Sequence, residues 1–193
     1  MAQGYTKVEG VNFDESFAPV ARFESIRILM SIACTTNFKL YQMHMKCAYI
    51  NGYLNEELFV EQPKGFKDPN FLDHVLRLKK AFYGLKQAHR AWYNWLIYYL
   101  LDRGFKRGYA DRTLFVKNDE DYLLVAQIYV DDIVFRVTID AQAIEFFKEM
   151  KREFEMSMLG ELTFFLVFKS NKRRKAYLFH KKTMLEILSR SLD

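Results

Sequence analysis

The chain has 193 residues, of which 50% are hydrophobic, and its formal net charge is +5. This length and apolar content suffice for a buried core without disulfides or structural metals. The two cysteines, Cys34 and Cys47, lie in apolar contexts, which favours free, buried thiols in a reducing compartment. No apolar run approaches the roughly 18 residues of a membrane helix, and residues 1–20 lack the apolar core of a signal peptide. The composition therefore argues against membrane insertion and secretion, and predicts a cytoplasmic or nuclear protein.

Hydrophobic periodicity predicts a mixture of helices and strands along the chain. Apolar residues at helical spacing predict a first helix from Phe23 to about Thr36. Strands are predicted at 38–45, 58–61 and 75–78. A long helix is predicted from Gln87 to Arg103, because Gly104 is a typical helix terminator. The remaining predicted elements are a strand at 113–116 pairing with 123–129, a strand at 133–137, a helix at 141–155 closed by Gly160, a hairpin of 162–168 with 176–179, and a terminal helix. Together they predict a single domain, 1–193, of the α+β class, with an antiparallel sheet backed by helices.

Two adjacent carboxylates interrupt the apolar segment from Gln127 to Phe135. Aspartate is depleted in strands, so Asp131 and Asp132 are predicted to occupy the tip of a tight hairpin. Carboxylates held on a rigid hairpin can bind Mg²⁺, which takes oxygen ligands. An acidic turn without a ligand is the alternative for this pair alone.

The flanking residues make the pattern more specific. Tyr-x-Asp-Asp between β-forming residues resembles the catalytic signature of reverse transcriptases. Four further segments, in order and spacing, resemble blocks of the copia-type retrotransposon reverse transcriptases: Phe13–Val20, Gln42–Gly52, Glu61–Phe66 and Leu78–Tyr93. The chain is therefore identified as resembling this family over most of its length.

The resemblance implies a palm-and-fingers polymerase fold. Fingers are expected at about 1–37 and 54–90, palm at about 38–53 and 91–168, and the start of a thumb at about 169–193. It also implies an RNA template, a DNA primer and deoxynucleoside triphosphates as partners, with no membrane. Protease, integrase and ribonuclease H segments of a Pol polyprotein, and the family's first basic strand, are not found in these residues, so we expect a fragment of a polyprotein.

One departure from the family concerns the metal ligands. By resemblance, Asp131 and Asp132 are catalytic metal ligands, and His44 stands where the family has a third aspartate. Two-metal phosphoryl transfer needs both ions in place, and Mg²⁺ tolerates imidazole poorly. We therefore expect weak binding of Mg²⁺, or of Mn²⁺ as an alternative, and an impaired enzyme. A His-Asp-Asp set that binds Zn²⁺ or Mn²⁺ is the alternative interpretation.

The resemblance also implies a nucleotide-binding block. Cys47 and Ala48 would offer backbone amides to the triphosphate, and Tyr49 would screen the sugar 2′ position. A second set would pack on the incoming nucleotide: Tyr83, Gly84, Lys86 and Gln87. Each has an ordinary structural alternative, with Tyr49 in the core, Gly84 in a turn and Lys86 on the surface.

Further departures from the family pattern suggest relaxed constraint on the residues at the motif positions. The family's proline is His89 here, its small residues after the hairpin are Arg136 and Val137, and a later glycine is Val167.

A basic cluster near the C-terminus predicts nucleic-acid binding by Lys172, Arg173, Arg174 and Lys175. A solvated charge run is the alternative. Three functions stay open at this point: a decayed RNA-directed DNA polymerase, an active polymerase completed by other segments, and a non-enzymatic nucleic-acid-binding remnant.

Overall fold

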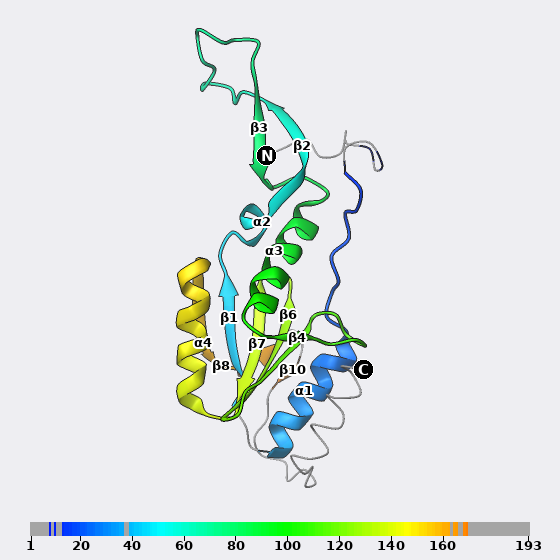
Figure 1. Ribbon diagram of the computed structural model, residues 1–193, viewed down its shortest axis with the longest axis vertical. Coiled ribbons are helices and arrows are strands. Elements are labelled where there is room, and N and C mark those ends of the chain that lie inside the picture. The colour runs from blue at the N-terminus through cyan, green and yellow to red at the C-terminus, as the bar shows by residue number, and fades with distance from the viewer. Residues whose placement is uncertain are drawn as a thin grey trace. The chain divides into compact units, whose positions relative to one another are not determined.

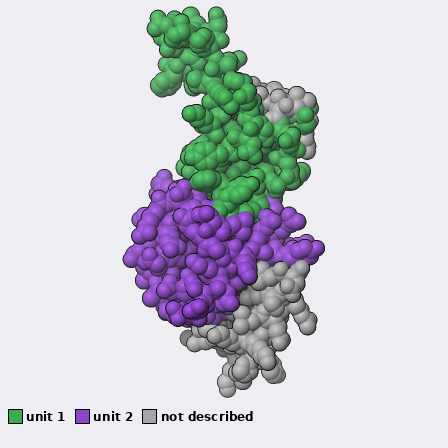
Figure 2. All heavy atoms as spheres, in the orientation of Figure 1, with its two compact units in different colours: residues 1–18, 47–98 green, residues 19–46, 99–193 purple. Residues whose placement is uncertain are grey.

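The computed structural model describes residues 8, 10, 13–36, 39–162, 164, 165, 168 and 169. Two compact units are present. Unit 1 consists of residues 1–18 and 47–98, and unit 2 of residues 19–46 and 99–193 (Figure 2). The predicted α+β class with antiparallel sheets is confirmed. No helix in the described ranges is long and apolar enough to cross a membrane.

Unit 2 is built on a six-stranded antiparallel sheet, whose spatial order is β4-β5-β6-β7-β1-β8 (Figure 1). Its strands are β1 (Tyr41–Met45), β4 (Lys106–Arg107), β5 (Leu114–Asn118), β6 (Leu123–Tyr129), β7 (Asp132–Val137) and β8 (Met156–Glu161). The hairpin of β6 and β7 lies at the centre of the sheet, so both of its strands are paired on both sides. Central strands are the most rigid part of a sheet, which suits a site that needs fixed ligands.

Two helices cover opposite faces of this sheet, α1 (Phe23–Thr36) and α4 (Asp140–Glu153) (Figure 1). Side chains alternate between faces along a strand. Val134 of β7 belongs to the core cluster that contains the apolar side chains of α1. Its neighbour Phe135 faces the other way and contacts Phe146 of α4, with ring centroids 5.1 Å apart. Both faces of β7 are therefore buried, and only its first residue, Asp132, reaches partly into solvent.

Unit 1 contains a two-stranded antiparallel sheet of β2 (Tyr53–Glu61) and β3 (Val75–Lys80), the short helix α2 (Ala48–Asn51), and most of α3 (Ala88–Asp102), which ends in unit 2. Its small core includes Leu58, Leu85 and Ala91. Gly52 lies directly against the backbone of α3. A Cβ at this position would stand 2.4 Å from the Trp92 backbone nitrogen, so only glycine fits without a shift of the chain.

Several predicted elements agree with the structure. The helix from Phe23, the long helix before Gly104, the strand 123–129 and its pairing with the preceding strand are confirmed. The strand predicted at 38–45 begins at Tyr41, and β2 begins at Tyr53 instead of residue 58. The sequence did not predict α2 or β4. The strand at 176–179 and the terminal helix lie outside the described residues.

The segment after α4 differs from the prediction. The helix ends at Glu153, because Phe154 takes an extended conformation with φ −124° and ψ 146°. Gly160 therefore does not close the helix. It lies within β8, with φ +89°, opposite Gln42 where the pairing of β1 and β8 shifts register. Of the strand predicted at 162–168, the described residues show β9 (Phe164–Phe165), which pairs with β10 (Phe168–Lys169).

The turn of the central hairpin is tight and strained. Tyr129 pairs with Asp132, which leaves Val130 and Asp131 as the two turn residues. Val130 has φ +57°, a left-handed conformation that is unfavourable for a β-branched residue. Such strain persists only where the surrounding structure imposes it. Here the central strands fix both ends of the turn.

A buried polar network ties β6 to the segment before β5. Asp111 is 5% exposed, and its carboxylate accepts hydrogen bonds from the Thr113 hydroxyl at 2.6 Å and from Gln127 Nε2 at 3.3 Å. It also accepts one from the backbone N–H of Arg22, just before α1, at 3.3 Å. Thr113 in turn binds Gln127 Nε2 at 2.5 Å. One carboxylate therefore connects α1, the segment before β5, and β6, the strand that leads into the hairpin turn.

The network sets the ionisation of Asp111. Burial by itself raises the pKa of this carboxyl, but hydrogen bonds from Ser25, Thr113 and Arg22 outweigh it and bring the pKa below its ordinary value. A carboxyl whose pKa is lower in the folded state stabilises the fold above its unfolded pKa. This contribution is lost as pH falls through the folded pKa.

We predict that Asp111→Asn lowers the free energy of unfolding at neutral pH by about 1.5–3 kcal/mol, because an amide supplies one acceptor oxygen and no charge. Urea denaturation followed by circular dichroism measures the loss. The matched control is Asp119→Asn, since Asp119 is an exposed residue between β5 and β6 whose carboxylate accepts a hydrogen bond from the adjacent backbone N–H of Glu120. On acidification, the stability of Asp111→Asn should fall less than that of the wild type. Equal losses of stability in the two proteins would contradict the role given to this carboxylate.

We predict that Val130→Gly raises the free energy of unfolding by up to about 1 kcal/mol, because glycine adopts a positive φ without steric cost. The same substitution at Val134, a buried strand residue, should instead destabilise the protein. Thermal denaturation of the two variants and the wild type provides the comparison. A destabilised Val130→Gly would show that contacts of the valine side chain outweigh the strain of its backbone.

Candidate active site

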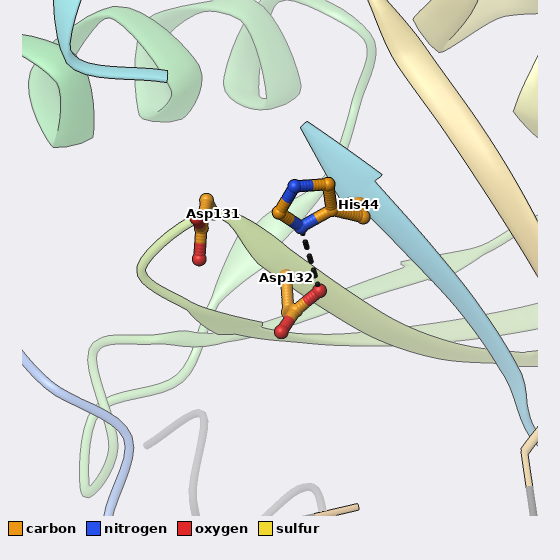
Figure 3. Close-up of side chains that lie close together, drawn as sticks. All are labelled: His44, Asp131 and Asp132. Carbon is orange, nitrogen blue, oxygen red and sulfur yellow. Dashed lines mark hydrogen bonds and ion pairs between the residues drawn. The ribbon is translucent and has the colours of Figure 1, made fainter. Parts of the chain in front are cut away.

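Three side chains with metal-binding atoms meet at the tip of the central hairpin. His44 lies near the end of β1, Asp131 in the hairpin turn, and Asp132 at the start of β7 (Figure 3). One ligand atom from each residue lies within 4.8 Å of the others. No other such group of three or more His, Cys, Asp or Glu side chains occurs in the described ranges. The structure therefore brings together the two predicted metal ligands, Asp131 and Asp132, and His44, the predicted position of a lost ligand.

Backbone pairing positions this cluster. His44 stands directly opposite Asp132 in the antiparallel pair of β1 and β7, so both side chains project from the same face. The backbone N–H of Met45 donates to the carbonyl of Asp131 at 2.7 Å, which fixes the turn against β1. The position of all three residues is thus set by main-chain hydrogen bonds.

The side chains of the cluster are close and accessible. His44 Nδ1 lies 3.2 Å from Asp132 Oδ1, and their side chains are 40% and 26% exposed. Figure 3 shows this contact as a dashed line, with Asp131 beside it on the turn. The arrangement offers one imidazole nitrogen and two carboxylates to a cation that arrives from solvent. Chemically, it can hold a divalent ion with coordination positions left over for other ligands.

The residues predicted to bind nucleotide all belong to unit 1. Cys47 is exposed and adopts φ +54° immediately before α2, whereas Ala48 is buried. The prediction of a buried Cys47 thiol is wrong, because this left-handed residue is the N-cap of α2 and its side chain is exposed. Gly84 has φ +96°, which agrees with its place in a turn.

Aromatic rings and a buried amide form the rest of this block. Tyr49 is partly buried, and its ring packs edge-on against Tyr83 with centroids 5.9 Å apart. The ring of His89 lies 4.3 Å from that of Tyr49. Gln87 is 2% exposed, and neither atom of its side-chain amide has a hydrogen-bond partner among the described residues. Lys86 is exposed, with its ammonium 5.9 Å from the centroid of the Phe13 ring.

The positions that depart from the family pattern lie in different environments. His89 is exposed beside Tyr49, while Arg136 is 3% exposed within β7. Burial lowers the pKa of the Arg136 guanidinium to about 10. Val137 is also buried. Val167 and the basic cluster Lys172, Arg173, Arg174 and Lys175 lie outside the described residues.

Sequence reasoning missed the residues that support the hairpin. Asp111 and Thr113 were not singled out, although an aspartate commonly accepts a hydrogen bond from the backbone N–H two residues further on. The Thr113 backbone N–H does donate to Asp111 Oδ1 at 2.9 Å. The turn is connected to the site through Gln127 of β6, which is distant in sequence. A local sequence pattern does not reveal that partner.

Comparisons with known proteins agree with this geometry. The family model described as reverse transcriptase (RNA-dependent DNA polymerase) matches residues 1–188. A retrovirus-related Pol polyprotein from transposon RE2 of Arabidopsis thaliana is 32% identical over 99% of this chain, and one from transposon TNT 1-94 of Nicotiana tabacum is 31% identical over 98%. A putative transposon Ty5-1 protein of Saccharomyces cerevisiae is 29% identical over 64% of the chain.

The chain spans 13% of the RE2 polyprotein, 15% of the TNT 1-94 polyprotein and 40% of the Ty5-1 protein. No solved structure matches it significantly. The family model matches nearly the whole chain, and the hairpin that carries Asp131 and Asp132 lies beside His44. These two observations lead to one conclusion. The chain belongs to the reverse transcriptase family and is a reverse transcriptase domain of the copia type.

Proposed function

We propose that this domain is an RNA-directed DNA polymerase whose nucleotidyl transfer is strongly impaired in this copy. The observation that carries the proposal is the position of His44, paired with Asp132 at the hairpin and within 4.8 Å of both aspartates. It occupies the place where the family supplies a third carboxylate. The impairment is local to the site, since the strands that hold it are paired along their length.

The three residues do not fit a pair of Mg²⁺ ions. Reverse transcriptases use divalent metal ions in general. Two such ions bring four positive charges, and the two carboxylates of this cluster supply two negative ones. Mg²⁺ also requires oxygen ligands in near-octahedral geometry, and a ring nitrogen is a poor substitute. Loss of one such ligand commonly lowers the rate by roughly a thousandfold or more.

We further propose that unit 1 holds the incoming nucleotide. Gln87 supports this proposal, because a buried amide with unsatisfied atoms is costly unless a ligand or water completes its bonds. Tyr49 and Tyr83 offer rings for packing on a sugar or base. Cys47 and Ala48 would give backbone N–H groups to the triphosphate, Lys86 would add a positive charge, and Gly84 would permit close approach of the chain.

The two units support an assignment of polymerase subdomains. We propose that the six-stranded sheet with the hairpin is the palm, and that β2 and β3 belong to the fingers. RNA template and DNA primer would then be the macromolecular partners. The net charge of +5 favours retained binding of nucleic acid even where chemistry is lost.

We predict that the purified chain does not extend a DNA primer on an RNA template with Mg²⁺, because a metal ligand is lost at His44. A gel-based extension assay with an intact copia-type domain as positive control measures this. Extension at a rate within tenfold of the control would contradict the proposed impairment.

We predict that His44→Asp tightens binding of Mg²⁺ or Mn²⁺ at least several-fold, since it restores a third oxygen ligand and a negative charge. Isothermal titration of each ion into wild type and variant measures the change. Full polymerisation is not expected to return, because other positions such as His89 also differ and effects within one site are strongly non-additive. Unchanged metal affinity would show that residue 44 does not act with Asp131 and Asp132.

We predict weak, sequence-independent binding of nucleic-acid duplex, with affinity that falls steeply as salt rises. Changing the basic cluster Lys172, Arg173, Arg174 and Lys175 to alanine should make the slope of log affinity against log salt smaller by roughly three or four. The matched control changes four exposed lysines elsewhere: Lys64, Lys67, Lys148 and Lys151. An unchanged slope in the cluster variant would identify the cluster as a solvated charge run.

A further inference from the structure

We propose that His44, Asp131 and Asp132 form a site for a single transition-metal ion of the Zn²⁺ class, selective against Mg²⁺. This inference rests on the proposed function, in which the site no longer suits a magnesium pair. It goes further by naming the ion that the present residues would select. The substitution at residue 44 would thus change the metal preference of the site and not only weaken it.

The spacing of the ligand atoms suits one small ion. Ligands of a tetrahedral zinc ion lie about 2.0–2.1 Å from the metal, which places neighbouring ligand atoms roughly 3.3 Å apart. His44 Nδ1 and Asp132 Oδ1 are 3.2 Å apart. The third ligand atom lies within 4.8 Å, and a rotation about the side-chain bonds of Asp131 can shorten that separation. An ion can therefore replace the direct contact between His44 and Asp132 without moving the strands.

The chemistry of the donors favours the same ion. Imidazole nitrogen is a good ligand for Zn²⁺ and its neighbours in the first transition row, and a poor one for Mg²⁺. Affinity at a mixed nitrogen and oxygen site generally rises from Mn²⁺ through Co²⁺ to Cu²⁺. Two carboxylates balance the charge of one divalent ion. A second ion would add two uncompensated positive charges.

The surrounding strands hold the ligands in place. Met43 and Met45 flank His44 on β1 and are almost completely buried on the other face of the strand. Register also places Ser157 of β8 beside His44, opposite the side on which Asp132 lies. His44 therefore occupies a middle strand, anchored on both sides, although its ring reaches solvent. Fixed ligands lower the entropy cost of binding an ion.

Co²⁺ is the appropriate probe, because it takes Zn²⁺ sites and reports its coordination by visible absorption. We expect the full chain to bind one Co²⁺ per molecule, at least about a hundredfold more tightly than Mg²⁺. Zn²⁺ should displace the Co²⁺ spectrum at near-stoichiometric concentration, while excess Mg²⁺ leaves it unchanged. In NMR spectra, bound Co²⁺ should shift or broaden the His44 imidazole signals before those of the other three histidines.

Variants assign the site. His44→Ala and Asp132→Asn should each weaken Co²⁺ binding at least tenfold, because each removes one of three ligands. Asp121→Asn is the matched control, since Asp121 lies in the acidic turn between β5 and β6, which lacks a histidine. It should leave binding unchanged. His44→Asp should weaken Co²⁺ and strengthen Mg²⁺, which reverses the preference. Circular dichroism of each variant confirms that the fold is retained.

Any of three results would overturn the inference. Co²⁺ could bind wild type and His44→Ala with equal affinity, or Mg²⁺ could displace Co²⁺ at comparable concentration. Alternatively, Co²⁺ could broaden the imidazole signals of another histidine before those of His44. These measurements use no primer, template or nucleotide. Primer extension with Mg²⁺ at a rate near that of an intact copia-type domain would instead contradict the proposed impairment. The failure of the metal assignment and the failure of the proposed function are thus separate outcomes.

Discussion

The register between β1 and β7 is the constraint on which this site depends. His44 and Asp132 are 88 positions apart in the sequence and become neighbours only because they are paired residues of adjacent strands. A slip of one residue would turn His44 to the opposite face of the sheet. The slip is unfavourable because it would turn Met43 and Met45, which are almost completely buried, to the face on which His44 is partly exposed.

The same arrangement explains where the molecule tolerates unfavourable features. Val130 keeps a positive φ in the turn, and Arg136 keeps a guanidinium in a buried strand. Both belong to the central hairpin, where the paired neighbours impose the backbone conformation. The Asp111 network provides part of this support, because it holds β6 through a carboxylate whose hydrogen bonds more than offset its burial.

Membership of the reverse transcriptase family and the chemistry of this copy are separate matters. The family match covers residues 1–188, and the strands that carry the metal position are intact. In the proposed assignment, His44 replaces an oxygen ligand of the family by a ring nitrogen and removes a negative charge. Folding depends on packing and backbone pairing, so it is insensitive to this change. Metal choice depends on the ligand atoms themselves, so it responds to it directly.

Motif spacing was enough to predict the family. The α+β class, the extent of α1 and the central hairpin that carries Asp131 and Asp132 could also be predicted, because helical and strand periodicities and a short turn are local properties. Tertiary packing was needed to show which face His44 occupies, that Asp111 contacts Gln127, and that Cys47 is exposed. It also places Gly160 in β8, where pairing with β1 shifts register, and not at the end of α4. These features depend on partners distant in sequence, and the periodicity of one segment carries no information about the partner it will meet.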